Sequence, residues 1–140
     1  MGLNCCIFGL GYIGLPTACV LVKAGYKVTG VDINHNLVKE LNDNKVSINE
    51  PGLRESLGEA INTGNFTATT EPVTSDIYLI AVPTPFKNIK SKVPQPNIEN
   101  VISSAKSISK VIKKNQIILI ESTCPVGTTR KVASLIEKIT

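Results

Sequence analysis

The chain of 140 residues lacks tryptophan and has a single histidine, and aromatic residues make up only 4% of it. These few aromatics are not interleaved with the lysines, so the sequence offers no stacking surface for a nucleic acid. Its longest apolar run, residues 77–82, is far shorter than the ~20 residues that span a bilayer. Neither end shows the basic and apolar pattern of a secretion signal. We therefore expect no nucleic-acid partner, no membrane span and a cytoplasmic location.

Cysteines in metal-ligand spacing are also lacking. The four cysteines are Cys5, Cys6, Cys19 and Cys124. They form no CxxC pair and have no histidine beside them, so neither a zinc site nor a disulfide framework is predicted. We expect reduced thiols, buried as cysteine side chains usually are, and no metal.

The composition that is present fits a folded domain. Hydrophobic residues make up 42% and charged residues 19%, which excludes a disordered or collagen-like chain. A chain of 15.0 kDa with a mean hydropathy of +0.13 can form a core without a metal or a disulfide. The net charge of +4 comes mostly from lysines within residues 87–92 and 106–114 and suits an anionic ligand without establishing one.

Short apolar runs alternate with helical patterns along the whole chain. The predicted strands are 3–8, 26–33, 66–70, 76–82 and 116–121, and the predicted helices are 12–24, 35–43, a short one ending near 63, one capped by Asn97 and one from about 128. Residues 83–96 hold four prolines and are predicted to be a loop. This alternation predicts an α/β fold, a Rossmann-type doubly wound parallel sheet of order 3-2-1-4-5.

The last helical stripe is still continuing where the sequence stops. Val132, Leu135, Ile136 and Ile139 follow helical spacing up to Thr140. We therefore expect residues 1–140 to form one domain cut from a longer protein.

A glycine-rich motif joins the first predicted strand to the first helix. Gly9, Gly11 and Gly14 have the GxGxxG spacing. In such a loop Gly9 permits a tight turn, Gly11 lets a pyrophosphate approach the backbone, and Gly14 lets helix and strand pack closely, while the N–H groups of the helix start face the phosphates. The alternative is a glycine-rich turn without a ligand.

Asp32 ends the second predicted strand, where the adenosine ribose of a dinucleotide would lie. Its carboxylate can accept hydrogen bonds from ribose hydroxyls, each contributing about 1.5–3 kcal/mol. It would repel a 2′-phosphate at 4 Å by about 4 kcal/mol per charge pair, and residues 33–36 include no arginine to offset this. The sequence therefore predicts NAD rather than NADP. Asp32 could also cap the next helix, and His35 is expected at that helix start.

Four segments in register resemble the nucleotide-sugar 6-dehydrogenases, the UDP-glucose/GDP-mannose dehydrogenase family. They are FGLGYIGLPTA at 8–18, NEPGL at 49–53, AVPTPF at 81–86 and ESTCPVGTT at 121–129. The PTPFK form of the third segment is most similar to the UDP-N-acetylmannosamine dehydrogenases.

The resemblance implies an activity for the full-length protein. Such enzymes oxidise C6 of a UDP-sugar to a carboxylate with two NAD per product, through a thiohemiacetal and a thioester on a catalytic cysteine. They serve polysaccharide biosynthesis and usually dimerise. The cysteine, the lysine, the asparagine and the substrate-binding acids of the family lie beyond Thr140, and the only histidine is at the adenine end. We therefore expect the chain alone to bind NAD, to have no general base near the nicotinamide and to turn over nothing.

The resemblance also assigns site residues. Tyr12 and Ile13 would contact the pyrophosphate through backbone N–H groups, Val82, Pro83 and Thr84 would flank the middle of the cofactor, and Ser122 and Thr123 would lie beside the nicotinamide. The Thr123 hydroxyl would help to place the reacting oxygen or a water, which makes it the one catalytic candidate. Thr84 could instead cap its loop. Cys124 has no activating neighbour and is not expected to be the nucleophile, and Glu50 is expected to tie its loop to the sheet.

Other functions fit parts of the sequence. UDP-glucose or GDP-mannose could be the substrate of the same family. The opening of β-hydroxyacid dehydrogenases is similar to residues 9–25, but that family lacks the NEPGL and PTPF segments. A non-catalytic module that senses a dinucleotide, such as the cytoplasmic domain of a potassium transporter, would explain the missing base but not ESTCPVGTT.

Overall fold

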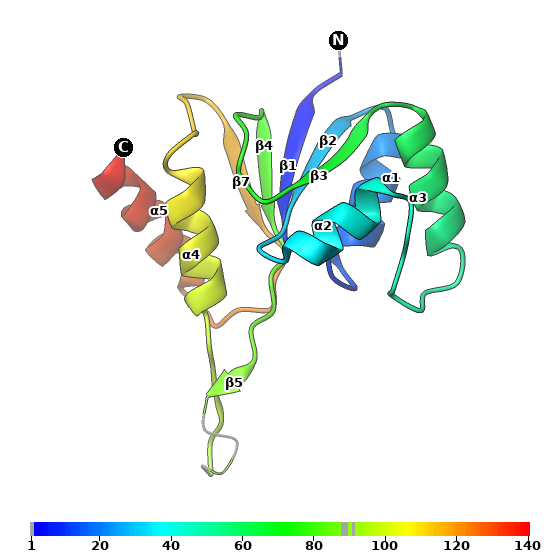
Figure 1. Ribbon diagram of the computed structural model, residues 1–140. Helices are drawn as coiled ribbons and strands as arrows, with labels where there is room; N and C mark the ends of the chain where they lie inside the picture. The colour runs from blue at the N-terminus through cyan, green and yellow to red at the C-terminus, as the bar shows by residue number, and fades with distance from the viewer. Residues whose placement is uncertain (1, 88–89, 91) are drawn as a thin grey trace.

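A parallel sheet forms the centre of the molecule in the computed structural model, which describes residues 2–87, 90 and 92–140 (Figure 1). Its strands are β1 (Asn4–Phe8), β2 (Lys27–Val31), β3 (Phe66–Thr69), β4 (Ile77–Ile80) and β7 (Ile117–Ile120). Their order is β3-β2-β1-β4-β7, and every pair is parallel. This confirms the predicted order 3-2-1-4-5, since β7 is the fifth strand of this sheet along the chain. The order reverses between β1 and β4, so their carboxyl ends border the crevice where ligands bind in such folds.

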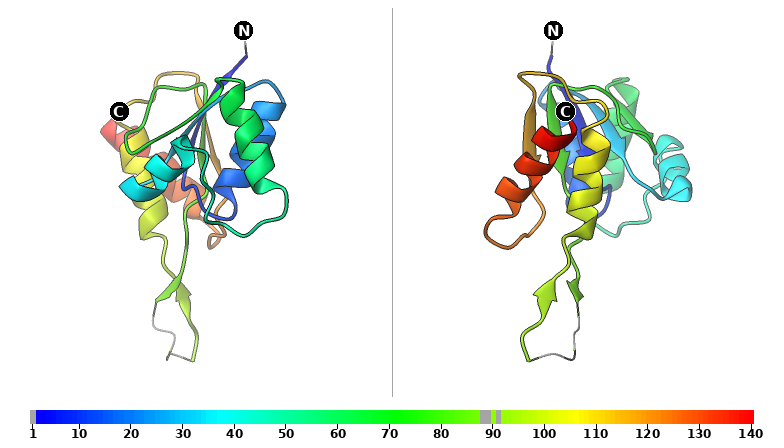
Figure 2. Two further views of the ribbon diagram at one scale, coloured as in Figure 1. Left: turned by 45° about the vertical axis from the view of Figure 1, so that its right-hand side comes forward. Right: turned by 90° about the vertical axis from the view of Figure 1, so that its left-hand side faces the viewer.

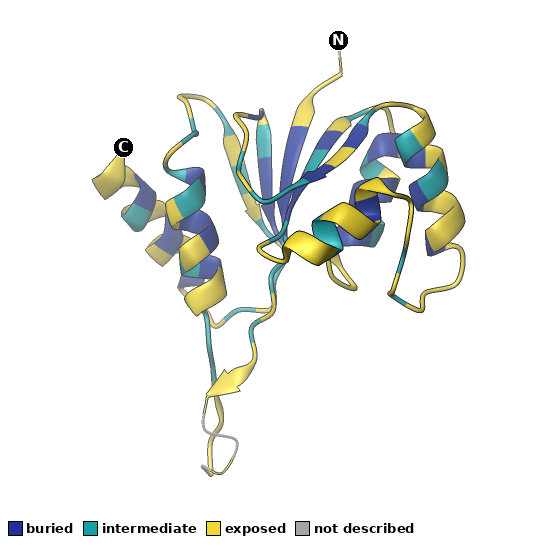
Figure 3. Ribbon diagram, viewed as in Figure 1, coloured by how far each residue is buried: buried dark blue, intermediate teal, exposed yellow. Residues whose placement is uncertain are grey.

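Helices cover the sheet on both faces. On one side lie α1 (Gly14–Lys23), α2 (His35–Asn42) and α3 (Leu53–Asn62), and on the other lie α4 (Glu99–Ile108) and α5 (Thr128–Ile139) (Figure 2). Alternate residues of β1 enter the two cores: Ile7 packs with the first helical layer, and Phe8 packs with the second. The central strands are buried on both faces, as Figure 3 shows. This explains why they appear in the sequence as continuous apolar runs.

The predicted burial of the cysteines is confirmed for three of them. Cys5, Cys6 and Cys19 are buried, and all four cysteines are free thiols. Burial raises the pKa of Cys6 and of Cys19 to about 11. Cys124 is only half-buried.

The first helix ends as its sequence predicts. Gly25 adopts a left-handed conformation with φ of +94°, and its N–H donates to the Val22 carbonyl at 2.9 Å. The Tyr26 N–H donates to the Leu21 carbonyl at 3.0 Å, which completes the left-handed C-terminal cap of α1. The helix itself begins at Gly14, two residues later than predicted.

The proline-rich segment is not wholly a loop, which corrects the prediction. β5 (Phe86–Lys87) and β6 (Gln95–Pro96) form a short antiparallel hairpin that projects from the carboxyl edge of the sheet (Figures 1 and 2). Pro96 lies opposite Phe86, and the Asn97 N–H next to this pair donates to the Pro85 carbonyl at 2.7 Å. Phe86 and Pro96 are therefore a non-hydrogen-bonded pair of the antiparallel ladder. Because no backbone N–H of such a pair donates across the ladder, proline is tolerated there.

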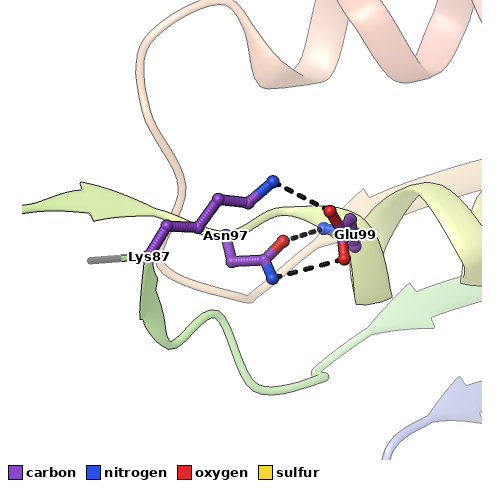
Figure 4. Close-up of polar contacts among 3 residues, drawn as sticks. All are labelled: Lys87, Asn97 and Glu99. Carbon is purple, nitrogen blue, oxygen red and sulfur yellow. Dashed lines mark hydrogen bonds and ion pairs between the residues drawn. The ribbon is translucent and has the colours of Figure 1, made fainter. Parts of the chain in front are cut away.

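Polar contacts fix the base of this hairpin (Figure 4). Lys87 forms an ion pair of 2.8 Å with Glu99, and the Asn97 carboxamide also donates to Glu99 at 3.4 Å. The Asn97 oxygen accepts from the Glu99 N–H at 2.9 Å, but Ile98 and not Asn97 is the N-cap of α4, so the predicted cap is wrong by one residue. The helix begins one residue later than predicted, so Ile98 directly precedes α4.

Within the part of the chain that the structure describes, no helix has the length and apolar character that a membrane span would require. The same residues bring together no group of three or more histidine, cysteine or acidic side chains that could hold a metal ion.

Candidate functional site

The glycine-rich loop connects β1 to α1, and each of its glycines meets a different demand. Gly9 has a φ of +92°, and a Cβ there would lie 2.6 Å from the Ala81 carbonyl oxygen. A Cβ on Gly14 would overlap the carbonyl oxygen of Gly9. Around Gly11 nothing lies within 4 Å of the Cβ position, so the backbone there is open to an approaching group. Gly9 and Gly14 thus shape the turn, and Gly11 leaves its outer side accessible.

Several backbone donors of this loop are unpaired. The N–H groups of Gly11, Tyr12, Ile13 and Gly14 have no hydrogen-bond acceptor among the described residues. Tyr12 and Ile13 are 68% and 56% exposed, so this part of the loop is accessible to a ligand. Unpaired amides together with the positive end of the α1 dipole attract an anion. The loop can therefore bind a phosphate or pyrophosphate through main-chain atoms alone.

The Asp32 carboxylate lies beside this loop at the end of β2. One oxygen accepts from the Leu10 N–H at 3.0 Å, and the other accepts from the Asn34 N–H at 3.0 Å. Because each carboxylate oxygen can accept a further bond, the group keeps capacity for ligand hydroxyls. The alternative role as the cap of α2 is wrong, since the Asn34 side chain accepts from the N–H groups of Asn36 and Leu37. His35 is the first residue of α2, as expected.

On the other side of the crevice, hydroxyl groups connect the loops that follow β4 and β7. The Ser122 hydroxyl donates to the Val82 carbonyl at 2.8 Å, and the Thr84 hydroxyl donates to the Thr123 carbonyl at 2.7 Å. The carboxamide of Asn100, in α4, donates to the Pro83 carbonyl at 2.9 Å. Residues 82–84 and 122–123 are thus brought together at one edge. The Thr84 hydroxyl does tie its loop, and the Ser122 hydroxyl is used within the protein.

Thr123 differs from these neighbours. Its side chain is exposed, and among the described residues its hydroxyl has no hydrogen-bond partner. Only its carbonyl is engaged, by Thr84. A free hydroxyl at the carboxyl end of β7 can donate to or accept from a bound molecule.

Cys124 follows directly, and its surroundings do not activate the thiol. Partial burial raises its pKa, which a hydrogen bond with Thr128 lowers only in part. A thiol with a raised pKa carries little thiolate at neutral pH and is a poor nucleophile. The structure therefore agrees with the expectation that Cys124 is not the reactive cysteine.

This environment predicts slow alkylation of Cys124. At pH 7 its reaction with iodoacetamide should be slower than that of free cysteine, and the rate should rise about tenfold per pH unit below the thiol pKa, because the thiolate fraction does. Mass spectrometry of the native chain measures the rate, with Cys124→Ser assigning the signal. Rapid alkylation at pH 7 that ceases in Cys124→Ser would show an activated thiol.

Glu121 is a site residue that the sequence analysis overlooked. Its carboxylate accepts from the Thr17 hydroxyl of α1 at 3.2 Å and 3.5 Å, which places an acidic group at the carboxyl end of β7. No general base near the nicotinamide was predicted from the sequence because only His35 was considered as a candidate. Glu121 was the last residue of the predicted strand 116–121, so the rule that drew attention to Thr123 applied to it equally.

A cavity lies away from the crevice. About 540 Å³ lies between α1 and α3, lined by residues that include Pro16, Val20 and Glu50. The side chain of Glu50 makes no hydrogen bond to another described residue, so the expected tie to the sheet is wrong. Its backbone instead forms local turn bonds with Ile48 and Leu53.

Sequence comparison provides the deciding observation. Residues 3–140 match the profile described as the UDP-glucose/GDP-mannose dehydrogenase family, NAD binding domain. The chain belongs to this family. Membership confirms the resemblance carried by the four segments and the predicted cofactor, NAD, and it decides against the β-hydroxyacid dehydrogenase and sensing-module alternatives.

Individual relatives agree with the family. The chain is 46% identical over 128 residues to a UDP-N-acetyl-D-mannosamine dehydrogenase of Campylobacter jejuni, covering 91% of this chain and 31% of that protein. It is 42% identical over 127 residues to an NDP-N-acetyl-D-galactosaminuronic acid dehydrogenase of Ralstonia nicotianae, covering 91% and 29%. The solved UDP-N-acetyl-mannosamine dehydrogenase of Staphylococcus aureus superposes with a TM-score of 0.90 at 38% identity, over 97% of this chain and 33% of that one. The chain thus spans about a third of these relatives.

Proposed function

We propose that this family member binds NAD across the carboxyl edge of the sheet, with the adenosine ribose at Asp32 and the pyrophosphate over the loop from Gly9 to Gly14. The unpaired N–H groups of Gly11, Tyr12, Ile13 and Gly14 carry the proposal, because they are donors without acceptors beside an anchored carboxylate. In this orientation the nicotinamide half extends toward β4 and β7, since β1 lies between β2 and β4.

The remaining predicted residues fit the other half of the cofactor. Val82, Pro83 and Thr84 would flank its middle, and Ser122 and Thr123 would lie beside the nicotinamide. When bound, NAD supplies a hydride acceptor. The free Thr123 hydroxyl would position the alcohol oxygen of the substrate, or a water, through a hydrogen bond, while Ser122 and Thr84 would keep the two loops in register.

For the full-length protein we propose oxidation of C6 of a nucleotide sugar, UDP-N-acetylmannosamine, to the uronic acid with two NAD per product. The names of the relatives and the PTPFK sequence at 83–87 support this substrate. An N-acetylgalactosamine nucleotide is the second candidate, because the Ralstonia relative is 42% identical. The substrate domain and the catalytic cysteine would lie outside this chain, which alone would bind NAD without turnover. Dimerisation, a cytoplasmic location and a place in polysaccharide biosynthesis stay predictions of the resemblance and the sequence.

The role proposed for Asp32 can be measured with Asp32→Asn. Loss of the negative charge should weaken NAD binding and remove the repulsion of a 2′-phosphate, so the preference for NAD over NADP should fall about tenfold or more. Isothermal titration calorimetry with both dinucleotides gives this preference directly.

Asp43→Asn is the matched control, because Asp43 is an exposed acid at the far end of α2 and the change in net charge is the same. It should leave the preference unaltered. If Asp32→Asn discriminates between NAD and NADP as the unmodified chain does, the adenosine ribose does not lie at Asp32.

A further inference from the structure

Glu121 directly follows β7, on the opposite side of β1 from Asp32. Its N–H donates to the Ile80 carbonyl of β4 at 2.9 Å, which fixes its backbone at the end of the sheet. Its carboxylate is held by the Thr17 hydroxyl of α1 at 3.2 Å. Glu121 is exposed, so the carboxylate stays accessible to a ligand although it contacts α1.

No ion pair neutralises this carboxylate within the part of the chain that the structure describes. Among the described residues the only ion pair is that of Lys87 with Glu99, at the base of the hairpin. The hydrogen bond from Thr17 comes from a neutral hydroxyl and leaves the negative charge of Glu121 in place. An exposed carboxylate with no ion-pair partner among the described residues therefore lies at the carboxyl end of β7, beside α1.

The orientation of the bound dinucleotide determines which of its ends lies near the Glu121 carboxylate. Asp32 at β2 and Glu121 at β7 lie on opposite sides of β1 in the order β3-β2-β1-β4-β7. A dinucleotide with its adenosine at Asp32 and its pyrophosphate over the glycine loop presents its nicotinamide end to the side of Glu121. This step rests on the cofactor orientation given under the proposed function.

The two redox forms of the cofactor differ in charge at this end. The oxidised nicotinamide ring carries a positive charge, and the reduced ring is neutral, while the pyrophosphate is the same in both. A nearby carboxylate attracts the cationic ring, and this attraction falls with distance and with salt. We propose that Glu121 is a selectivity residue that makes the chain bind NAD⁺ more tightly, relative to NADH, than it otherwise would. Such a bias favours release of the reduced product.

A purely structural role makes a different prediction. If Glu121 only connects β7 to α1 through Thr17, replacing it should change the dissociation constants of NAD⁺ and NADH by the same factor, or leave both unchanged. The ratio of the two dissociation constants therefore separates charge selectivity from a structural tie.

The test is calorimetric titration of Glu121→Gln with NAD⁺ and with NADH. The amide keeps the size of the side chain and removes its charge, so the ratio Kd(NAD⁺)/Kd(NADH) should rise about threefold or more, as expected of a partly screened charge. The control is Glu71→Gln, which changes the net charge equally but follows β3, at the opposite end of the sheet. Its ratio should match that of the unmodified chain.

An unchanged ratio in Glu121→Gln, or a rise of the same size in Glu71→Gln, would overturn the proposal. If Glu121→Gln does not fold, a salt titration of the unmodified chain replaces it: the ratio should rise with salt as the attraction is screened, and a constant ratio would overturn the proposal. Normal discrimination against NADP alongside an unchanged ratio would refute only the role of Glu121 and leave the proposed cofactor site intact.

Discussion

Gly11→Val is expected to abolish measurable binding of NAD while leaving the thermal unfolding of the chain unchanged. No atom lies within 4 Å of the Cβ position, so the side chain fits the folded protein, but it occupies the space through which the pyrophosphate would reach the free amides. Losing two or more charge-assisted hydrogen bonds corresponds to a loss of affinity of about a hundredfold or more. Calorimetry measures the affinity, and circular dichroism measures the unfolding temperature.

Gly11→Ala provides a graded control, because a single methyl group should obstruct the approach less than the valine side chain and weaken binding by a smaller factor. Normal NAD affinity in a folded Gly11→Val protein would mean that the pyrophosphate does not approach Gly11, and the binding mode proposed for the glycine loop would fail.

Gly14→Ala is expected to act on folding instead of on binding and to cause a large loss of stability. The added methyl group would overlap the Gly9 carbonyl oxygen and approach the Ala81 side chain, so α1 would have to move away from β1. Overpacking against backbone atoms that cannot rotate away should lower the free energy of unfolding by about 3 kcal/mol or more. Chemical denaturation measures this quantity.

The matched comparison is the free energy of unfolding of Gly11→Ala. This variant makes the same chemical change in the same loop at an open position and should alter stability by no more than about 0.5 kcal/mol. Equal losses in the two variants would show that close packing at Gly14 does not determine the position of α1.

The sheet was predictable because its signals are local. Apolar runs such as residues 76–82 mark buried strands, and the helical stripes between them force parallel connections, so the order of the five strands followed. The hairpin was not predicted because its formation depends on the register in which its two strands pair. Whether proline can join a ladder depends on which partner it faces, and the pairing of Pro96 with Phe86 across a non-hydrogen-bonded position is not visible in the sequence.

The candidate site was predictable where spacing fixes geometry, and not where side chains from distant segments meet. The glycine loop and Asp32 follow from spacing alone. The bond from the Leu10 amide to Asp32, and the contact of Glu121 with Thr17 across 104 residues, depend on how α1 sits on the sheet. The sequence also could not show that the Ser122 hydroxyl donates to the Val82 carbonyl, while the Thr123 hydroxyl has no partner among the described residues.

The hydroxyl-to-carbonyl bonds between the segments after β4 and β7 affect how a ligand is received. Ser122 and Thr84 each donate across the gap, so the two segments are already locked together before anything binds. A molecule that binds there meets two segments already held in place and loses little free energy in organising them. Which ligands this edge accepts would then depend on how well the ligand itself fits, because the two segments have little freedom to adjust.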